Sequence, residues 1–433
     1  MKPKFSVFQV VLLAFFGACA VAGVLIFAFV IGGGGGASIG EVRIWGTLDQ
    51  GAFNVVLRQL SETEGRLKQV SYTQMREETF GRELTDALAS GAGPDLVLLR
   101  SDEATREAPK LLPIAYEELS REQFQNTFVA AADPFLGTDG VLAVPLVVDP
   151  LVLFWNRDML ASAGFSQPPR YWDELYSVAT AATRRSETNS IEKSTIAFGE
   201  YANVDHAKDI LAMLILQAGG SVTARDSTGR LRPALMPRAG EGQHPTESAL
   251  RFYVEFSNPA REHYTWNRSL QSSRARFAAG DLALYVGYAS EEPLLRRMNP
   301  NLNLGAAPMP QIRTADTAVT GAHTYGFAVP RAAANPAGGR TVAYLLGSRD
   351  ASSALSLALG IPSARRDVLS QAAQGNDELY NRQALIARAW LDPDTEATDR
   401  IFRDMIENVT SGSLRLSESI QRAEQAMAQL LTI

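Results

Sequence analysis

The side chains that most often carry enzyme chemistry occur in this 433-residue sequence without the spacing that catalysis requires. A Gly-x-Ser-x-Gly string occurs at residues 36–40, but it precedes an expected strand and does not join a strand to a helix as a nucleophile turn does. There is no phosphate-binding glycine loop and no His-Glu-x-x-His pair. The four histidines are scattered, and none has a second ligand at metal spacing: His206, His244, His263 and His323. We therefore expect a binding protein with no catalytic residue, no metal and no cofactor. A pair of carboxylates that meets only in space, as in a glycosidase, would still leave no pattern in the sequence.

Aromatic and acidic side chains instead lie where predicted strands and turns meet. Trp45 ends an apolar stretch beside a Gly-Thr turn, where an indole could stack on a sugar ring or fill the core. Asp49 has two interpretations as well, an acceptor for a ligand hydroxyl or the N-cap of the next helix. Trp266 lies in an aromatic and polar string, residues 264–267, which favours the edge of a cleft. These three residues are candidate ligand contacts.

The elements that must position such residues alternate between strands and helices after Gly40. Glu41–Thr47 is expected to form a strand, Ala52–Glu64 a helix and Lys68–Tyr72 a second strand. A helix over Thr79–Ser90, closed by glycines, leads into a buried strand over Pro94–Leu99. This order predicts a parallel α/β sheet.

The rest of the chain continues in the same style. Val141–Val148 is expected to begin a strand that Pro150 interrupts, because proline has no backbone N–H, and Leu151–Trp155 continues it. Ser221–Gln243 is polar and rich in Gly, Pro and Arg, which indicates a surface excursion. After Pro362 the pattern is mostly helical.

Composition excludes several classes of function. Apolar residues make up 46% and charged residues 20% of the chain, values typical of a folded protein. Lys2 and Lys4 are the only charges before Glu41, and 39 basic and 47 acidic residues follow them. This negative balance disfavours binding to nucleic acid or to anionic lipid. The length suits two lobes better than one domain.

The N-terminal segment is long enough to cross a membrane. Residues 5–31 carry no charge, and Ser6 and Gln9 are polar in an otherwise apolar stretch. As a helix they would span roughly 40 Å, against about 30 Å for a hydrocarbon core. Lys2 and Lys4 precede this stretch and no basic residue follows until Arg43, so the N-terminus is expected in the cytoplasm. We predict a single-pass anchor in the cytoplasmic membrane over residues 1–31, with the remainder outside.

Two other fates of this segment compete with retention. Phe16–Cys19 faintly resembles a lipoprotein processing box, with Cys19 as the lipid acceptor, but the residues that follow stay apolar. Cleavage near Gly32 is the second alternative, although the apolar core is longer than that of a usual signal peptide. Residues 32–40 are a Gly-rich linker, which is expected to be flexible.

Short motifs run in order from Glu41 to Ser363. They are EVRIWG at 41–46, PDLVLL at 94–99, VPLVVDPLVLFWNRDML at 144–160, PPRYWDEL at 168–175 and FAAGDLALYV at 277–286, followed by APMP at 307–310, GFA at 326–328 and Ser348. Together they resemble the family-1 extracellular solute-binding proteins of ABC importers, the group that contains maltose-binding protein. Tyr171 stands where that family usually has Thr, and the C-terminal helices match only loosely.

The resemblance implies a two-lobed α/β fold, the type II periplasmic-binding-protein fold, over residues 41–433. It places one lobe at about 41–147 and 326–365, and the other at about 148–325 and 366–433. A solute would bind in the cleft between the lobes, and the lobes would close on it by a hinge motion.

The same resemblance implies which further residues line that cleft. They follow the ends of strands or lie in the crossing segments: Asp102, Asp149, Glu200, Tyr201, Tyr288, His323 and Tyr325. Aromatic faces stack on sugar C–H surfaces, and carboxylates accept hydrogen bonds from hydroxyls.

The predicted function is therefore capture of a small solute, with a carbohydrate expected, and its delivery to an ABC permease. Two alternatives use the same fold. One is an extracytoplasmic sensor or adhesion module, and the other is an enzyme that acts on glycans in the cleft.

Overall fold

The computed structural model describes residues 39–237 and 244–432. The predicted anchor over residues 1–31, with its alternatives at Cys19 and Gly32, lies outside the described residues, as does most of the linker. Within the described part of the chain, every helix is too short or too polar to span a bilayer.

The first half of the main sheet confirms the predicted alternation of strands and helices. Strands β1 (Val42–Gly46), β2 (Val70–Gln74) and β3 (Leu96–Arg100) are parallel, with β1 in the middle. Helices α2 (Gln50–Thr63) and α3 (Glu77–Ser90) connect them. Every second residue of β1 is buried, which is the pattern expected of a strand covered on one face.

Strand β4 (Val144–Asn156) is the longest strand and joins the two halves of the sheet. Its first part pairs with β11 (Thr320–Ala328), and its second part pairs with β9 (Leu282–Tyr288). The predicted interruption at Pro150 was wrong, because β4 runs through it without a break. Pro150 is the last residue that pairs with β11, and Leu151 is the first that pairs with β9. The N–H that proline lacks is therefore at the position where the pairing of β4 with β11 ends and its pairing with β9 begins.

The second half of the sheet lies beyond β9. Strand β6 (Ile191–Ile196) pairs with β9 in parallel, β5 (Arg184–Arg185) pairs with β6, and β10 (Leu304–Ala307) pairs with the end of β4. The predicted surface excursion contains a short hairpin within its described residues, formed by β7 (Thr223–Arg225) and β8 (Leu231–Pro233). β12 (Ala387–Arg388) pairs with β11.

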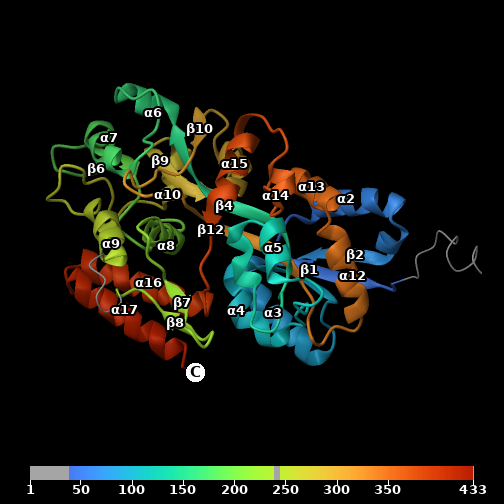
Figure 1. Cartoon of the computed structure of the whole chain (residues 1–433). Helices are drawn as coiled ribbons and strands as arrows, with labels where there is room; N and C mark the ends of the chain where they lie inside the picture. The colour runs from blue at the N-terminus through green and yellow to red at the C-terminus, as the bar shows by residue number, and fades with distance from the viewer. Residues whose placement is uncertain (1–38, 238–243, 433) are drawn as a thin grey trace, which may run out of the picture.

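Helices cover both halves of the sheet (Figure 1). Around the first half lie α4 (Ala104–Glu107), α5 (Arg121–Thr127), α12 (Pro336–Leu346), α13 (Arg349–Leu359) and α14 (Arg366–Leu369). Around the second half lie α6 (Arg157–Ser162), α7 (Leu175–Ala182), α8 (Ala207–Gln217), α9 (Pro245–Glu255), α10 (Ser273–Ala279), α11 (Glu292–Met298), α16 (Thr395–Thr410) and α17 (Leu416–Leu430). Helix α15 (Gly375–Ile386) packs on β4 where the halves meet.

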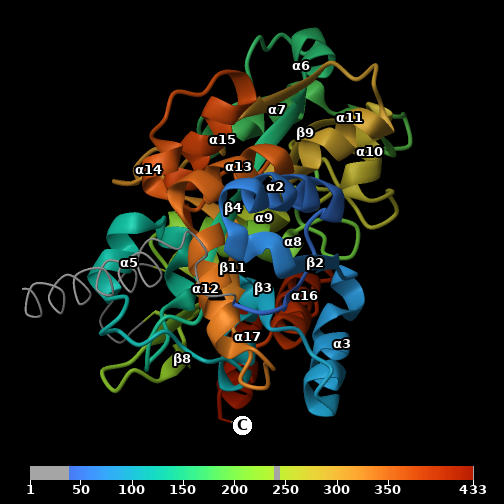
Figure 2. The ribbon, with the colours of Figure 1, turned by 90° about the vertical axis from the view of Figure 1, so that its right-hand side faces the viewer.

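Buried apolar side chains form two separate cores, which makes the molecule two-lobed. One core includes residues of β1, β3, α2 and the first part of β4. The other includes residues of the second part of β4, β9, α8 and α16. Strands β4 and β11 pass from one lobe to the other, and the turned view shows α2 and α13 stacked on the same lobe (Figure 2).

Candidate functional site

A cavity of about 1160 Å³ opens between the two lobes. The lobe built on β1 and β3 contributes the end of β3, the start of α3 and part of β11. The other lobe contributes the loop before α8, the end of β9, the start of α10 and the first turns of α16. Its charged lining consists of eight carboxylates and five basic side chains: Glu77, Asp102, Asp149, Asp205, Asp209, Glu291, Glu396, Asp399, Arg100, Lys208, Arg274, Arg400 and Arg403.

Arg100 and Asp102 form a bidentate ion pair at the carboxyl end of β3. The guanidinium donates to both carboxylate oxygens, at 2.7 and 2.9 Å, and also to Glu77. Burial alone would raise the pKa of Asp102, but Arg100 and His323 outweigh it and hold that pKa at about 2. Asp102 is therefore ionised at neutral pH.

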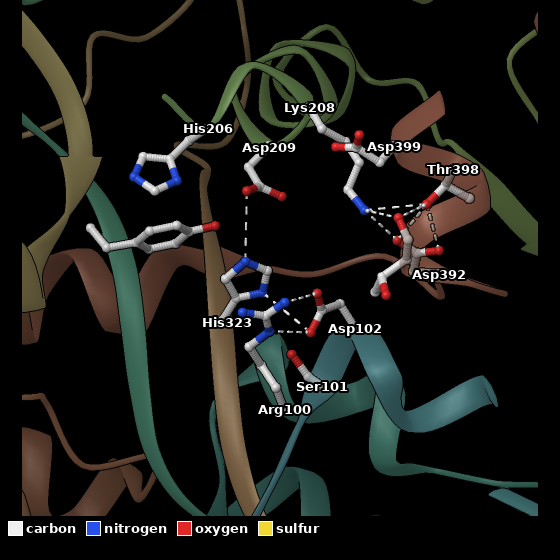
Figure 3. Close-up of polar contacts among 12 residues, drawn as sticks. Arg100, Ser101, Asp102, His206, Lys208, Asp209, His323, Asp392, Thr398 and Asp399 are labelled. Atoms are coloured by element: carbon white, nitrogen blue, oxygen red, sulfur yellow. Dashed lines mark hydrogen bonds and ion pairs between the residues drawn. The ribbon is translucent and has the colours of Figure 1, made fainter. Parts of the chain in front are cut away.

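His323 lies between carboxylates from the two lobes (Figure 3). Its Nδ1 is 3.7 Å from Asp102, and its Nε2 is 3.7 Å from Asp209 in the first turn of α8. The ring of Tyr288 lies 4.9 Å from the His323 ring, centre to centre. Burial would raise the pKa of Asp209, but His323 and Lys208 hold it well below the usual range. One imidazole thus connects β3, β11 and α8.

Asp149 lies on β4 between the lobes and is only 5% exposed. Its Oδ1 accepts a hydrogen bond of 3.0 Å from the backbone N–H of Ser290. Burial raises the pKa of Asp149 to about 6, against the opposing effect of the hydrogen bonds from Ser290.

A second group of charges surrounds Glu291 after β9. Glu291 accepts hydrogen bonds from Arg274 at 2.8 Å and Tyr285 at 2.7 Å, and it lies 2.6 Å from His206 Nε2. Burial would lower the pKa of His206, but the hydrogen bond and charge of Glu291 raise it overall. His206 also has a left-handed backbone (φ 63°), a conformation that is uncommon outside glycine and that clusters at functional sites.

Lys208 connects α8 to the start of α16. Its ammonium group donates to Asp392 at 2.8 Å, to Thr398 at 3.2 Å and to the carbonyl of Thr395 at 3.3 Å. Asp392 is 1% exposed, so this ion pair is almost fully desolvated. Figure 3 shows the pair directly beside the Asp102–His323–Asp209 arrangement.

Residues 61–381 match the family described as bacterial extracellular solute-binding protein. This match covers well over half of the chain. The chain belongs to that family. Its solute-binding part accordingly lies outside the cytoplasm. No curated protein matches the sequence.

Solved structures of the same fold cover the chain almost completely. The cyclic α-maltosyl-1,6-maltose binding protein from Arthrobacter globiformis is similar with a TM-score of 0.73 and 15% identity, over 90% of this chain and 98% of that one. An ABC transporter solute-binding protein from Thermotoga lettingae, bound to α-D-tagatose, has a TM-score of 0.67 and 20% identity, over 90% and 100%. A maltose/maltodextrin-binding domain from Bdellovibrio bacteriovorus, bound to maltotriose, has a TM-score of 0.66 and 17% identity, over 91% and 100%. At these identities the likeness establishes the shared fold.

Six of the ten predicted ligand contacts of this solute-binding protein line the cavity: Asp102, Asp149, Tyr201, Tyr288, His323 and Tyr325. Tyr201 donates its hydroxyl hydrogen to Asp399, and Arg403 lies over its ring. Contact of these side chains with a solute stays a prediction.

The other four predicted contacts lie outside the lining. Trp45 is half-buried on β1 and packs against the core of its lobe. Asp49 is exposed and accepts a 2.7 Å hydrogen bond from the N–H of Ala52, so it caps α2. Glu200 is buried and pairs with Arg268 at 3.3 Å. Trp266 is fully buried and donates to Asn203 at 3.1 Å.

Several lining residues escaped the sequence prediction, most of them charged: Arg100, Asp205, His206, Lys208, Asp209, Arg274 and Glu291. A sequence pattern could have found Asp205–Asp209, five consecutive residues that all line the cavity. This charged run leads directly into a strongly apolar helix. Within the described residues, no group of three or more His, Cys, Asp or Glu side chains is placed to hold a metal ion.

Proposed function

We propose that this chain captures a polyhydroxylated solute, a carbohydrate, between its lobes and delivers it to an ABC permease. The observation that carries the proposal is the polar cavity between two lobes, with the rings of Tyr288 and Tyr325 in its lining. Rings and fixed charges together suit a ligand with C–H faces and hydroxyl groups. The printed ligands of two structural neighbours, tagatose and maltotriose, support the same class.

The cavity is suited to couple binding with closure. Asp102 belongs to one lobe, whereas Asp209 and Tyr288 belong to the other. A solute that contacts both sides stabilises the closed arrangement by its differential affinity for it. We propose that the lobes, at about 41–147 with 326–365 and about 148–325 with 366–433, move as units about β4 and β11.

We also propose that residues 1–31 are retained as a membrane anchor, with residues 32–40 as its tether. This proposal rests on the apolar length and on the basic residues that precede it. A tethered receptor has a higher effective concentration at a membrane permease than one that diffuses freely.

A ligand screen tests the proposed function. Maltose, maltotriose, tagatose and other neutral sugars would be compared with amino acids and short peptides by thermal unfolding. A sugar present at a hundred times its Kd should stabilise the protein by about 2.7 kcal/mol. Stabilisation by a peptide or an amino acid, with none by any sugar, would overturn the carbohydrate assignment.

A further inference from the structure

Most basic side chains of the cavity lining already pair with other groups of the protein. Arg100 donates to Asp102 and Glu77, and Lys208 donates to Asp392, Thr395 and Thr398. Arg274 donates to Glu291 at 2.8 Å. The exposed Arg400 at the rim forms no ion pair with any described residue. The interior therefore offers no free cation to an acidic solute.

Asp149 is the opposite case, a buried carboxylate that forms no ion pair within the described residues, although the charge of His323, across the strand pair, acts on it at longer range. It is 5% exposed, and Ser290 is its hydrogen-bonding neighbour in the described chain. It takes part in no ion pair across residues 39–237 and 244–432, although it lines the cavity. A buried carboxylate is costly unless it is paired, so a positive group on the solute would offset that cost.

The sheet register places aromatic rings around this carboxylate. Asp149 pairs with His323 across β4 and β11, and Tyr325 lies two residues further along β11. Tyr288 pairs with Leu151, two residues after Asp149. Because alternate residues of a strand share a face, Asp149, His323, Tyr325 and Tyr288 all lie on one face of the sheet. Tyrosine faces attract cations as well as sugar C–H groups.

Resting on the proposed carbohydrate function, we propose that the cleft selects amine-bearing sugars, with the Asp149 carboxylate as the counter-ion of the protonated amine. The lining carries eight carboxylates against five lysine and arginine side chains and two histidines, so its field favours a cation. Neutral sugars bind more weakly because a hydroxyl leaves the buried charge unneutralised. Uronic acids bind most weakly, because they bring a second carboxylate to a site whose cations are occupied.

Calorimetric titration of the full chain in mild detergent at pH 7 tests this selectivity. The probes are matched trios of sugars built from glucose or from galactose. Each trio consists of the neutral sugar, its 2-amino derivative and its uronic acid. Each trio is offered as a monosaccharide and as α-1,4 and β-1,4 disaccharides. The amine form should bind about tenfold more tightly than the neutral form, the change expected for one charged hydrogen bond.

Asp149→Asn isolates the counter-ion, because the amide keeps the shape and the oxygen that accepts from Ser290. Asp149→Asn should bind the amine and neutral forms with affinities within about twofold of each other. The control variant Asp350→Asn should keep the wild-type preference for the amine form. Asp350 is an exposed carboxylate on α13 that does not belong to the cavity lining. Thermal unfolding confirms that each variant is folded.

The outcomes separate this inference from the proposed function. Neutral sugars that bind as tightly as their amine forms would overturn the amine selectivity and leave sugar binding intact. A preference for amines that survives in Asp149→Asn would overturn the role of Asp149. Failure of all three forms of every trio, together with no response in the wider sugar screen, would overturn both.

Discussion

Asp149 is a buried carboxylate whose charge lowers the stability of the folded chain. Its pKa of about 6 lies above the value of about 3.9 expected in an unfolded chain. Above pH 6 the folded protein must keep a buried charge that the unfolded chain exposes to water. Below about pH 4 the carboxyl is protonated in both states, and the cost disappears.

Asp149→Asn should therefore stabilise the unliganded protein at pH 7.5. Two pKa units correspond to about 3 kcal/mol, which is the upper limit of the gain. Urea unfolding of the variant and the wild type at pH 7.5 and pH 4 measures it. The difference should shrink towards zero at pH 4, and an equal difference at both values would mean that the charge is not its cause.

The candidate site shows which residues a sequence can reveal. Asp102, Tyr288 and His323 were predicted because each follows or lies in a segment with a family pattern. Arg274 was missed because nothing in its local sequence marks it, and only the fold brings it to the cavity lining and against Glu291, 17 residues later. Trp266 shows the reverse, since its aromatic and polar surroundings are satisfied inside the core by Asn203.

At the scale of elements, Asp49 is the N-cap of α2. Its carboxylate accepts a hydrogen bond from the N–H of Ala52, and Asp49 lies outside the cavity lining, which favours the capping interpretation over the ligand-contact interpretation. Asp49→Ala should lower the free energy of unfolding by about 1 kcal/mol, because a backbone N–H loses its partner. Denaturant unfolding measures this change.

A matched variant separates capping from ligand binding. Asparagine caps helices about as well as aspartate, so Asp49→Asn should keep wild-type stability. Both variants should keep the wild-type affinity for whichever sugar the protein binds. A loss of affinity in both, with stability unchanged, would restore the ligand-contact interpretation of Asp49.

The elements were predictable wherever a local pattern decides them. The alternation from β1 to β3 follows from apolar spacing and from the glycine that ends α3 at position 91. The continuity of β4 was not predictable, because whether a proline breaks a strand depends on which neighbour its missing N–H would have met. That neighbour changes at Pro150, and only the packed sheet shows it.

At the scale of the whole molecule, the chain length and the order of family motifs predicted two lobes, since periodicity alone predicts a parallel sheet without its division. The division depends on β4 and β11, each of which belongs partly to both lobes. Few strands join the lobes, whereas each lobe has its own core. Relative motion of the lobes therefore costs less than deformation of either one.

Two cysteine labels can measure this motion in the full chain after Cys19→Ser removes its only natural cysteine. Arg82→Cys on α3 and Asp404→Cys on α16 place dyes at exposed positions on opposite lobes. A sugar that raises the melting temperature should increase energy transfer between them, because a ligand that contacts both lobes shifts the population towards closure. Arg82→Cys with Leu357→Cys reports within one lobe and should stay constant, since α3 and α13 pack on the same core. Unchanged transfer in both pairs at saturating sugar would mean a rigid cleft, and transport by closure would then fail as an explanation even though binding stands.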